Sequence, residues 1–212
     1  QTEELNPFLS TEFSEIEGVK NPFGTGKVEQ SARLDVAGFF KDFPDFLVER
    51  GHLMRERFDY SKLDPLKNQY REMTFENIVF AEGMGVTENP YFKNIPLNPN
   101  KGHHIRVKLS ENLQNNFTIK KKHFLFPLDE NLHFYGGTYD REQLHHKIDG
   151  SAVEQLINGL GEIYMQDFEV VEEHFGFRPT VRDRRPLLGN HSEFQNFYVF
   201  NGLGTRGILN GC

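Results

Sequence analysis

Two short, unbroken apolar runs, each followed by glycines, constrain the fold of this chain more than any other feature of its sequence. Residues 77–81, apolar from Ile78 onward, lead through Glu82 to Gly83 and Gly85, and residues 197–200 lead through Asn201 to the glycine-rich stretch 202–207. Continuous rather than alternating apolar residues are typical of strands that are covered on both faces, as in parallel sheets. We therefore expect two buried, parallel-type strands, each ending in a glycine turn.

Most of the other predicted strands are antiparallel. Residues 105–109 alternate between apolar and basic side chains, which indicates a strand with one solvent-facing side. Residues 117–126 and 132–135 are joined by a proline and a turn-forming Asp-Glu-Asn, the pattern of an antiparallel hairpin. Further strands are expected at 28–34, 52–58 and 168–177.

Two helices are predicted from apolar stripes at helical spacing. Asp35 is a candidate N-cap for a helix over 35–50, with a kink or break expected at Pro44 because proline lacks a backbone N–H. Ser151 opens a second helix over 151–165, with Glu154 three residues later as in a capping box. Runs of strands with few helices predict an α+β fold, largely an antiparallel sheet with flanking helices and the two parallel-type strands beside it.

Composition limits the classes of partner. The 212 residues suffice for one large domain or two small ones, and net charge −7 argues against a general nucleic-acid binder. The single cysteine, Cys212, is the last residue, so neither a disulfide framework nor a cysteine-based zinc site is expected. No apolar run approaches the ~18–20 residues of a membrane span and no signal peptide opens the chain, so a cytoplasmic protein without a membrane partner is expected. Because the chain begins at Gln1 and stops just after a glycine turn, both ends are expected to be cut.

The stretch 202–207, Gly-Leu-Gly-Thr-Arg-Gly, satisfies the spacing G-x-G-x-x-G directly after a predicted strand. A dinucleotide-binding turn opens a unit of about 30 residues with an acidic residue about 20 positions on, and only five residues follow Gly207. This stretch is therefore not the primary nucleotide turn. It is either a junction whose backbone N–H groups meet a negatively charged ligand oxygen, or a plain glycine turn.

An arginine cluster lies in the proline- and glycine-punctuated loop predicted at 178–191. Arg178, Arg182, Arg184 and Arg185 fall within eight positions of an acidic chain. The guanidinium fork matches a carboxylate or phosphate, and Arg178 is the leading candidate because it directly precedes a proline. Pairing with surface carboxylates is the alternative for each arginine. Adjacent histidines at 103–104 and 145–146 point to opposite faces of a strand, and no nucleophile motif is present, so neither a metal site nor a nucleophilic catalytic residue is predicted.

Three motifs follow one another near the end of the chain: Gly-Phe-Arg-Pro at 176–179, an Asp-to-Gly turn at 183–189, and a closing strand with a glycine turn at 197–209. Their order resembles the flavoprotein oxidoreductases typified by D-amino-acid oxidase, glycine oxidase and sarcosine oxidase. Residues 124–127 with 136–139 also resemble the substrate-domain hairpin of that family, and residues 78–83 resemble its strand leading back to the cofactor. The resemblance covers nearly the whole chain from about residue 26 onward.

The resemblance implies FAD as cofactor, hydride transfer from a small-molecule amine or amino acid to flavin, hydrolysis of the imine, and reoxidation by oxygen or another acceptor. It places Arg178 on the substrate carboxylate. Phe124 stands where glycine-oxidising members place a tyrosine that helps to hold the carboxylate, which implies a more apolar substrate or a different pose. The residues implied to lie beside the cofactor are Gly202, Leu203, Gly204, Thr205, Glu82 and Gly83.

The resemblance also implies that the chain is the C-terminal portion of such an enzyme, because no G-x-G-x-x-G fingerprint precedes Gly24. A missing N-terminal FAD-binding half is then a partner, and the isolated chain is expected to be inactive. The implied organisation is an irregular lead-in at 1–26, a mixed segment at 27–75, a remnant FAD-domain strand and loop at 76–100, an antiparallel substrate-binding domain at 101–170, and a return to the FAD-binding domain at 171–212.

Two other functions stay open at this point. A non-catalytic ligand-binding or interaction domain would keep the sheet and the arginine pocket without holding flavin. A tRNA-modifying branch of the same family oxidises a modified base, which the stretch 182–185 favours and the net charge opposes. Substrate identity, stereospecificity, the electron acceptor and homo-oligomerisation are not determined by these patterns.

Overall fold

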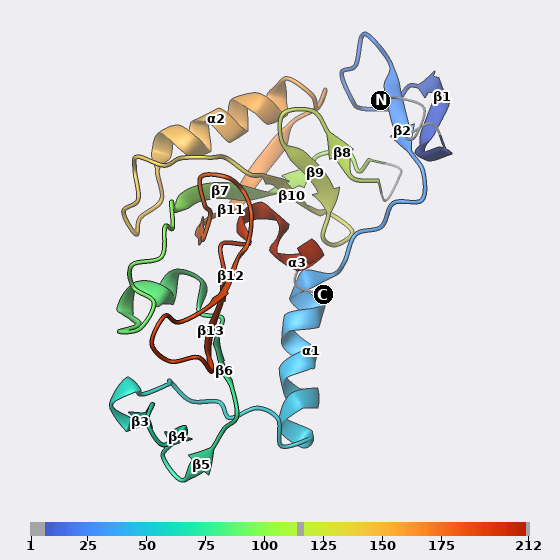
Figure 1. The fold of residues 1–212 in the computed structure, drawn as a ribbon. Coiled ribbons are helices and arrows are strands. Elements are labelled where there is room, and N and C mark those ends of the chain that lie inside the picture. Colours follow the sequence, from blue (N-terminus) through green and yellow to red (C-terminus); the bar gives the residue numbers. More distant parts are fainter. Residues whose placement is uncertain (1–6, 114–116, 211–212) are drawn as a thin grey trace. The chain divides into compact units, whose positions relative to one another are not determined.

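An antiparallel five-stranded sheet, which we call the large sheet, dominates the computed structural model, which describes residues 7–113 and 117–210 (Figure 1). Its strand order is β11 (Phe168–Arg178), β7 (Asn100–Leu109), β10 (Leu132–Gly136), β9 (Phe124–Pro127) and β8 (Ile119–Lys120). The predicted hairpin and the predicted long strand near residue 170 are confirmed, and the expected strand 117–126 is divided into β8 and β9. The α+β class is confirmed as well.

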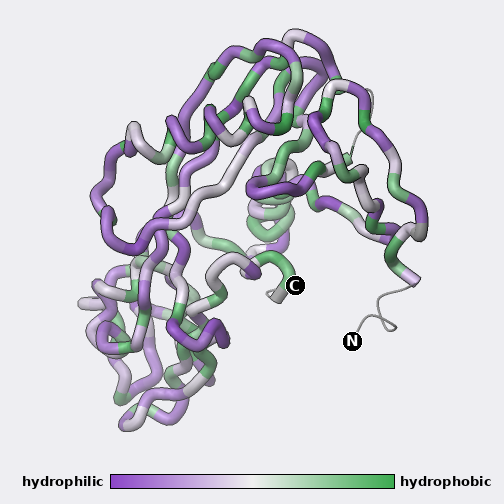
Figure 2. The backbone as a smooth tube through the Cα atoms, turned by 90° about the horizontal axis from the view of Figure 1, so that it is seen from above, coloured by the Kyte–Doolittle hydropathy of each residue, from purple (hydrophilic) through white to green (hydrophobic). Residues whose placement is uncertain are grey.

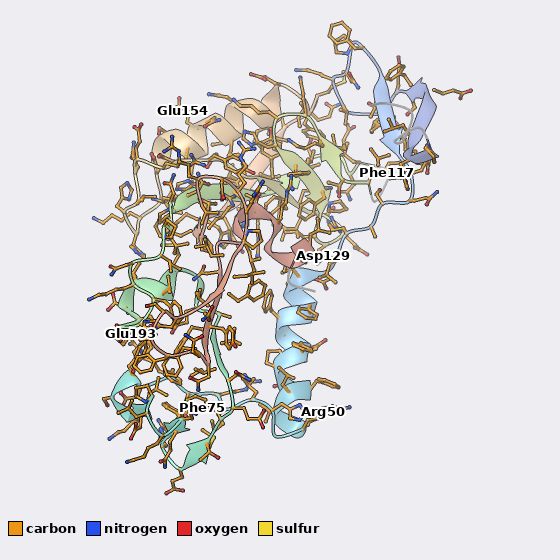
Figure 3. All side chains as sticks on the ribbon, in the orientation of Figure 1. Arg50, Phe75, Phe117, Asp129, Glu154 and Glu193 are labelled. Atoms are coloured by element: carbon orange, nitrogen blue, oxygen red, sulfur yellow. The ribbon has the colours of Figure 1, made fainter. Side chains whose placement is uncertain are left out.

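One face of the large sheet is buried beneath helix α2 (Gly150–Gly161), as Figure 1 shows. Ile105 and Val107 of β7 and Leu156 and Leu160 of α2 are all 0% exposed. Fully burying one such side chain stabilises a fold by roughly 1.5–3 kcal/mol. Glu154, labelled in Figure 3, lies on the exposed side of α2. The opposite face of β7, which carries its even-numbered residues, is left open for a site.

Asp149, rather than Ser151, caps α2. The Asp149 carboxylate accepts hydrogen bonds from the backbone N–H of Ser151 at 3.1 Å and from its hydroxyl at 2.9 Å. The predicted capping box of Ser151 and Glu154 is therefore wrong. The side chain that caps a helix accepts a hydrogen bond from the N–H two or three residues later, and here Asp149 is that residue while Ser151 is already inside the helix. The helix also ends at Gly161, earlier than the predicted residue 165.

The two apolar runs that end in glycines lie side by side as parallel strands. β6 (Ile78–Phe80) pairs in parallel with β13 (Phe197–Asn201), and β12 (Leu187–Asn190) pairs antiparallel along the other edge of β13. The parallel pairing of β6 and β13 confirms the prediction, whereas β12 falls in the stretch predicted as a loop. Aromatic rings pack against one another in this small sheet. The ring centre of Phe197 lies 5.7 Å from that of Phe80 and 6.1 Å from that of Phe75, which is labelled in Figure 3.

The chain divides into two compact units, residues 1–16 with 21–61 and residues 17–20 with 62–212. The first unit holds a hairpin of β1 (Leu9–Ser14) and β2 (Thr25–Val28) and the helix α1 (Val36–Glu49). The hairpin occupies part of the segment predicted to be irregular, and the strand predicted at 28–34 is wrong because β2 ends where that stretch begins. None of the described residues of α1 is buried.

Helix α1 begins as predicted, because the Asp35 carboxylate accepts a hydrogen bond from the Gly38 N–H at 3.0 Å. The helix continues through Pro44, so a break there is wrong. The rings of Phe39 and Phe43 stack at 4.9 Å on one side of the helix and support the turn that spans the proline. In Figure 2 the coil of α1 carries both hydrophobic and hydrophilic residues.

Short elements connect the larger ones. They are η2 (Tyr60–Lys62), β3 (Leu63–Asp64), β4 (Gln69–Tyr70), β5 (Met73–Thr74), η3 (Gly83–Glu88), η4 (Gly204–Arg206) and α3 (Gly207–Asn210). The strand predicted at 52–58 is absent from the structure, in which that stretch forms no regular element. Among the described residues, no helix has the length and apolar character needed to cross a membrane. The chain termini discussed above, Gln1 and Cys212, lie outside the described residues.

Candidate functional site

Arg178 is the last residue of β11 and lies opposite Asn100, the first residue of β7. Its Nη1 donates a hydrogen bond to the Asn100 side-chain oxygen at 2.8 Å and another to the Thr138 carbonyl at 3.1 Å. Its Cζ lies 4.8 Å from the centre of the Tyr139 ring, within the range of a cation–π contact. Strand β7 and the segment that follows β10 therefore hold one guanidinium in a single orientation.

The guanidinium lies directly over Gly102. A Cβ at residue 102 would overlap Nη1 and Nη2 of Arg178 and would lie 2.5 Å from its Cζ, and a Cβ at Gly137 would lie 2.9 Å from Nη2. Both glycines thus make room for the guanidinium. A glycine inside a strand often marks such a close approach, and at Gly102 the approaching group is a cation.

Arg178 is a desolvated cation without a carboxylate partner among the described residues. Burial lowers the pKa of Arg178, against a smaller opposing effect of Tyr139, yet a guanidinium stays charged in proteins. Its hydrogen-bond partners in the described part of the chain are two neutral oxygens, and a partly buried cation binds a carboxylate more strongly than such neutral acceptors. The site is therefore suited to an anionic ligand group.

The closing glycine turn is anchored to the residues that follow Arg178. The Gly204 N–H donates to the Pro179 carbonyl at 3.1 Å, and a Cβ at Gly204 would lie 3.1 Å from the Thr180 methyl carbon. Gly202 and Gly204 have φ angles of 71° and 57°, a region that glycine enters without strain. The backbone from Arg178 to Thr180 thus joins the anion site to the glycine turn.

The other predicted cofactor residues meet the same turn. The Asn201 amide donates to the Gly83 carbonyl at 2.8 Å, while its side-chain oxygen accepts from the Gly202 N–H at 2.8 Å. Glu82 accepts a hydrogen bond from the fully buried Asn89 at 2.8 Å. The predicted residues on the two parallel strands are therefore brought together, with Asn201 as the link that the sequence did not indicate.

Some backbone N–H groups of the glycine turn already donate hydrogen bonds within the protein, so only the others can donate to a ligand. The N–H groups of Gly202 and Gly204 are used within the protein, by Asn201 and Pro179. The N–H groups of Leu203 and Thr205 have no partner among residues 7–113 and 117–210. Two nearby free N–H groups at a strand-to-helix junction suit a partly negative oxygen, such as a carbonyl of a flavin ring.

Phe124 lies apart from Arg178. It is 45% exposed on β9, on the same open face of the large sheet, and β10 and β7 separate its strand from β11. The Lys120 ammonium lies 4.7 Å from the centre of its ring. The structure places Phe124 at the margin of the open face, whereas Asn100, Gly102 and Thr138, which sequence reasoning missed as site residues, contact the guanidinium itself.

The remaining arginines of the cluster differ from Arg178 in burial. Arg182, Arg184 and Arg185 are all exposed on the loop before β12.

The described residues contain no group of three or more His, Cys, Asp or Glu side chains placed to bind a metal ion.

Burial holds several histidines of the large sheet neutral. It is the main cause that lowers the pKa of His103, His123 and His133, and it lowers the pKa of His104 to about 4, with His174 and Arg106 adding to the effect. His103 Nε2 accepts a hydrogen bond from the Asp149 N–H at 3.1 Å, a bond that a protonated ring cannot accept.

We expect acid to destabilise the large sheet through these histidines. Because their folded-state pKa values lie below the unfolded value of about 6.5, the unfolded chain binds more protons, so this stability is present above pH 6.5 and is lost towards pH 4. His104 alone contributes about 1–2 kcal/mol after its partial exposure is discounted. Urea unfolding at pH 7.5 and pH 4.5 measures the effect. Equal or greater stability at pH 4.5 would contradict the neutral histidines.

The comparisons with known proteins agree with this geometry. The family model described as FAD dependent oxidoreductase matches residues 42–212, which is most of the chain. The chain belongs to the FAD-dependent oxidoreductase family. The resemblance inferred from the motifs is therefore confirmed, and the cofactor of the family is FAD.

Three proteins illustrate the relationships of this family member. The tRNA 5-methylaminomethyl-2-thiouridine biosynthesis bifunctional protein MnmC of Leptospira borgpetersenii is 27% identical over 184 residues, covering 70% of this chain and 28% of that protein. Glycine oxidase from Geobacillus kaustophilus has a TM-score of 0.54 at 24% identity, over 64% of this chain and 38% of that one. Glycerol-3-phosphate dehydrogenase from Bacillus halodurans, complexed with FAD, has a TM-score of 0.57 at 18% identity, over 96% and 44%. The chain thus spans less than half of each.

Proposed function

We propose that this chain forms the substrate-binding and flavin-contacting part of an enzyme that oxidises a carboxylate-bearing amine or amino acid. The observation that carries the proposal is the half-buried guanidinium of Arg178, which has no carboxylate partner within residues 7–113 and 117–210 and lies one residue before the proline whose carbonyl accepts a hydrogen bond from the glycine turn. Because the Gly204 N–H bonds to the Pro179 carbonyl, the anion site and the backbone donors of the turn are held close together, and they could hold substrate and cofactor next to each other.

Arg178 can bind a carboxylate with the part of its fork that the protein leaves free. Nη1 is engaged by Asn100 and Thr138, so Nη2 and Nε remain for the ligand. Two parallel charge-assisted bonds would fix the plane of the carboxylate and hence the face of the adjacent carbon. Bound FAD would supply a two-electron acceptor: the carbon would lose a hydride to it and the nitrogen a proton, and water would hydrolyse the resulting imine to a carbonyl and ammonia or an amine.

The glycine turn would hold the cofactor through its backbone. The N–H groups of Leu203 and Thr205 would donate to a flavin carbonyl oxygen, which would stabilise negative charge on the ring. Gly202 and Gly204 permit the turn itself, and Gly83 closes against it through Asn201. Glu82, bonded to Asn89, contributes to the shape of this region.

A second candidate is oxidation of an amine carried by a modified tRNA base. The alignment with the MnmC protein of Leptospira borgpetersenii covers 70% of this chain, and the name of that protein includes a methylaminomethyl-uridine. The exposed Arg182, Arg184 and Arg185 lie on the loop that begins at Arg178, where a phosphate backbone could be contacted. In both candidates the carbon that is oxidised is bonded to an amine nitrogen. The candidates differ in the size of the substrate, a small amino acid or a tRNA.

The visible absorption spectrum of the purified chain, titrated with FAD, tests flavin contact. We expect saturable binding with a shifted flavin band and quenched fluorescence. Gly204→Val is expected to weaken binding at least about tenfold, because a side chain there would be strained at φ 57° and would press on Thr180. Gly189→Ala, whose Cβ meets nothing within 4 Å, is the matched control.

If neither the chain nor a longer protein that carries it binds FAD, the chain is a ligand-binding module and the enzyme proposal is wrong. If FAD binds, turnover of free amino acids and of tRNA containing an alkylaminomethyl-uridine separates the two candidate substrates.

A further inference from the structure

Four rings stand in a row across the open face of the large sheet. They belong to Phe126 of β9, Phe134 of β10, His104 of β7 and His174 of β11. The centres of successive rings are 4.6, 4.6 and 4.8 Å apart, and successive planes meet at 12°, 27° and 14°. These spacings match the distance between neighbouring strands, so the rings stand upright, face to face, with their edges pointing away from the sheet.

His104 is the one imidazole of this row whose ring nitrogens have no hydrogen-bond partner in the described part of the chain. His174, stacked on it, bonds to the Glu172 carboxylate at 2.7 Å, and Glu172 also pairs with Arg106 at 3.0 Å. With a pKa of about 4, His104 is neutral near pH 7 and keeps one N–H and one acceptor nitrogen. The half-buried ring therefore offers an unused hydrogen-bond acceptor.

His104 and the Arg178 guanidinium lie on the same face of β7. The guanidinium covers Gly102, and residues two apart on a strand point to the same side at a spacing of about 6.8 Å. The two groups are therefore neighbours on one face, and a molecule with an amine and a carboxylate on the same carbon has one polar group for each of them. Gly136, opposite His104, leaves the neighbouring position of β10 without a side chain.

We propose that His104 accepts a hydrogen bond from the substrate amine while Arg178 binds its carboxylate, so that His104 is a substrate-positioning residue of this site. This inference rests on the proposed function and adds a second polar contact to the one that Arg178 makes. A carboxylate without an amine would use Arg178 alone, and an amine without a carboxylate would use His104 alone.

The test uses the flavin-loaded protein that carries this chain, with His104→Phe as the variant. Phenylalanine keeps a flat ring in the row and removes both nitrogens. Two quantities are compared: kcat/KM for the best substrate among glycine, N-methylglycine, alanine and proline, and the inhibition constant of propionate, which has the carboxylate without the amine. We expect kcat/KM to fall about tenfold or more and the inhibition constant to change less than twofold.

Two further variants separate hydrogen bonding from packing. His174→Phe is the matched control, because it changes a histidine of the same row whose nitrogen already bonds to Glu172, and both quantities are expected to stay within about threefold of wild type. His104→Gln retains an acceptor and is expected to recover at least half of the lost activity on a logarithmic scale. This rescue would not occur if His104 acted only by stacking.

An unchanged kcat/KM in a folded His104→Phe protein would overturn the inference. An equal loss of substrate turnover and propionate affinity would overturn it too, because the role of the ring would then be structural. A wild-type protein that binds FAD but oxidises none of the four amines would instead refute the proposed function, and with it the inference that depends on it.

Discussion

Replacing Arg178 with alanine is expected to lower kcat/KM for a carboxylate-bearing amine at least about 100-fold, mostly through KM. The substitution deletes two charge-assisted hydrogen bonds, each of which contributes about 1.5–3 kcal/mol, and 1.4 kcal/mol corresponds to a factor of ten. Stability should change little, because the lost bonds to Asn100 and Thr138 are offset by removal of a desolvated cation. Steady-state kinetics of the flavin-loaded protein and its melting temperature are the measurements.

Two controls make the Arg178 result specific. Arg178→Lys keeps the charge but loses the planar fork, so we expect an intermediate loss. Ethylamine has no carboxylate, so the preference of the wild-type protein for alanine over ethylamine should disappear in Arg178→Ala. If that preference survives, the carboxylate is bound elsewhere and the assignment of Arg178 is wrong.

Gly102→Ala is expected to reproduce much of the Arg178→Ala defect without touching the arginine. The new methyl group would overlap the guanidinium nitrogens, and the guanidinium is the movable end of a flexible side chain, so it would be displaced while β7 keeps its place. We expect kcat/KM to fall about 10- to 100-fold. The melting temperature should fall by less than about 4 °C, since the cost is paid by the side chain and not by the strand.

Gly176→Ala is the matched control for Gly102→Ala. Gly176 lies directly opposite Gly102 in the pairing of β11 with β7, yet a Cβ at residue 176 meets nothing within 4 Å. Its kinetics should stay within about twofold of wild type. Similar defects in both glycine variants would show that the effect comes from strand propensity and not from the position of the guanidinium.

The strands that carry strong local patterns were predictable. The apolar runs of β6 and β13 and their glycine ends follow from burial on both faces, and the Asp35 cap of α1 follows from the need of a helix for an early acceptor. The errors lie where local patterns were weak or ambiguous. Two neighbouring residues, Asp149 and Ser151, can each cap a helix, and β12 is too short to show a period.

Some residues of the candidate site could likewise be predicted from the sequence, and others could not. Arg178 stands out because an arginine fixed before a proline suits an anion, and the glycines after β13 stand out because they follow a buried strand. Asn100, which orients Arg178, lies 78 residues earlier in the chain, and no local pattern connects the two. Gly102 lies before the strand predicted at 105–109, so the close approach of a side chain to it became visible only when the structure extended β7 back to Asn100.

The sequence by itself determined the two parallel strands, the hairpin and the two helices, the arginine that could bind an anion and the family that the motifs resemble, because these depend on residues close together in the chain. Only the tertiary structure decided that β7 pairs with β11 so that Arg178 falls opposite Asn100 and over Gly102, and that His104 stands beside them with a free nitrogen. The register of two distant strands depends on which face of each strand is covered, and that choice is made by all the residues of a face together.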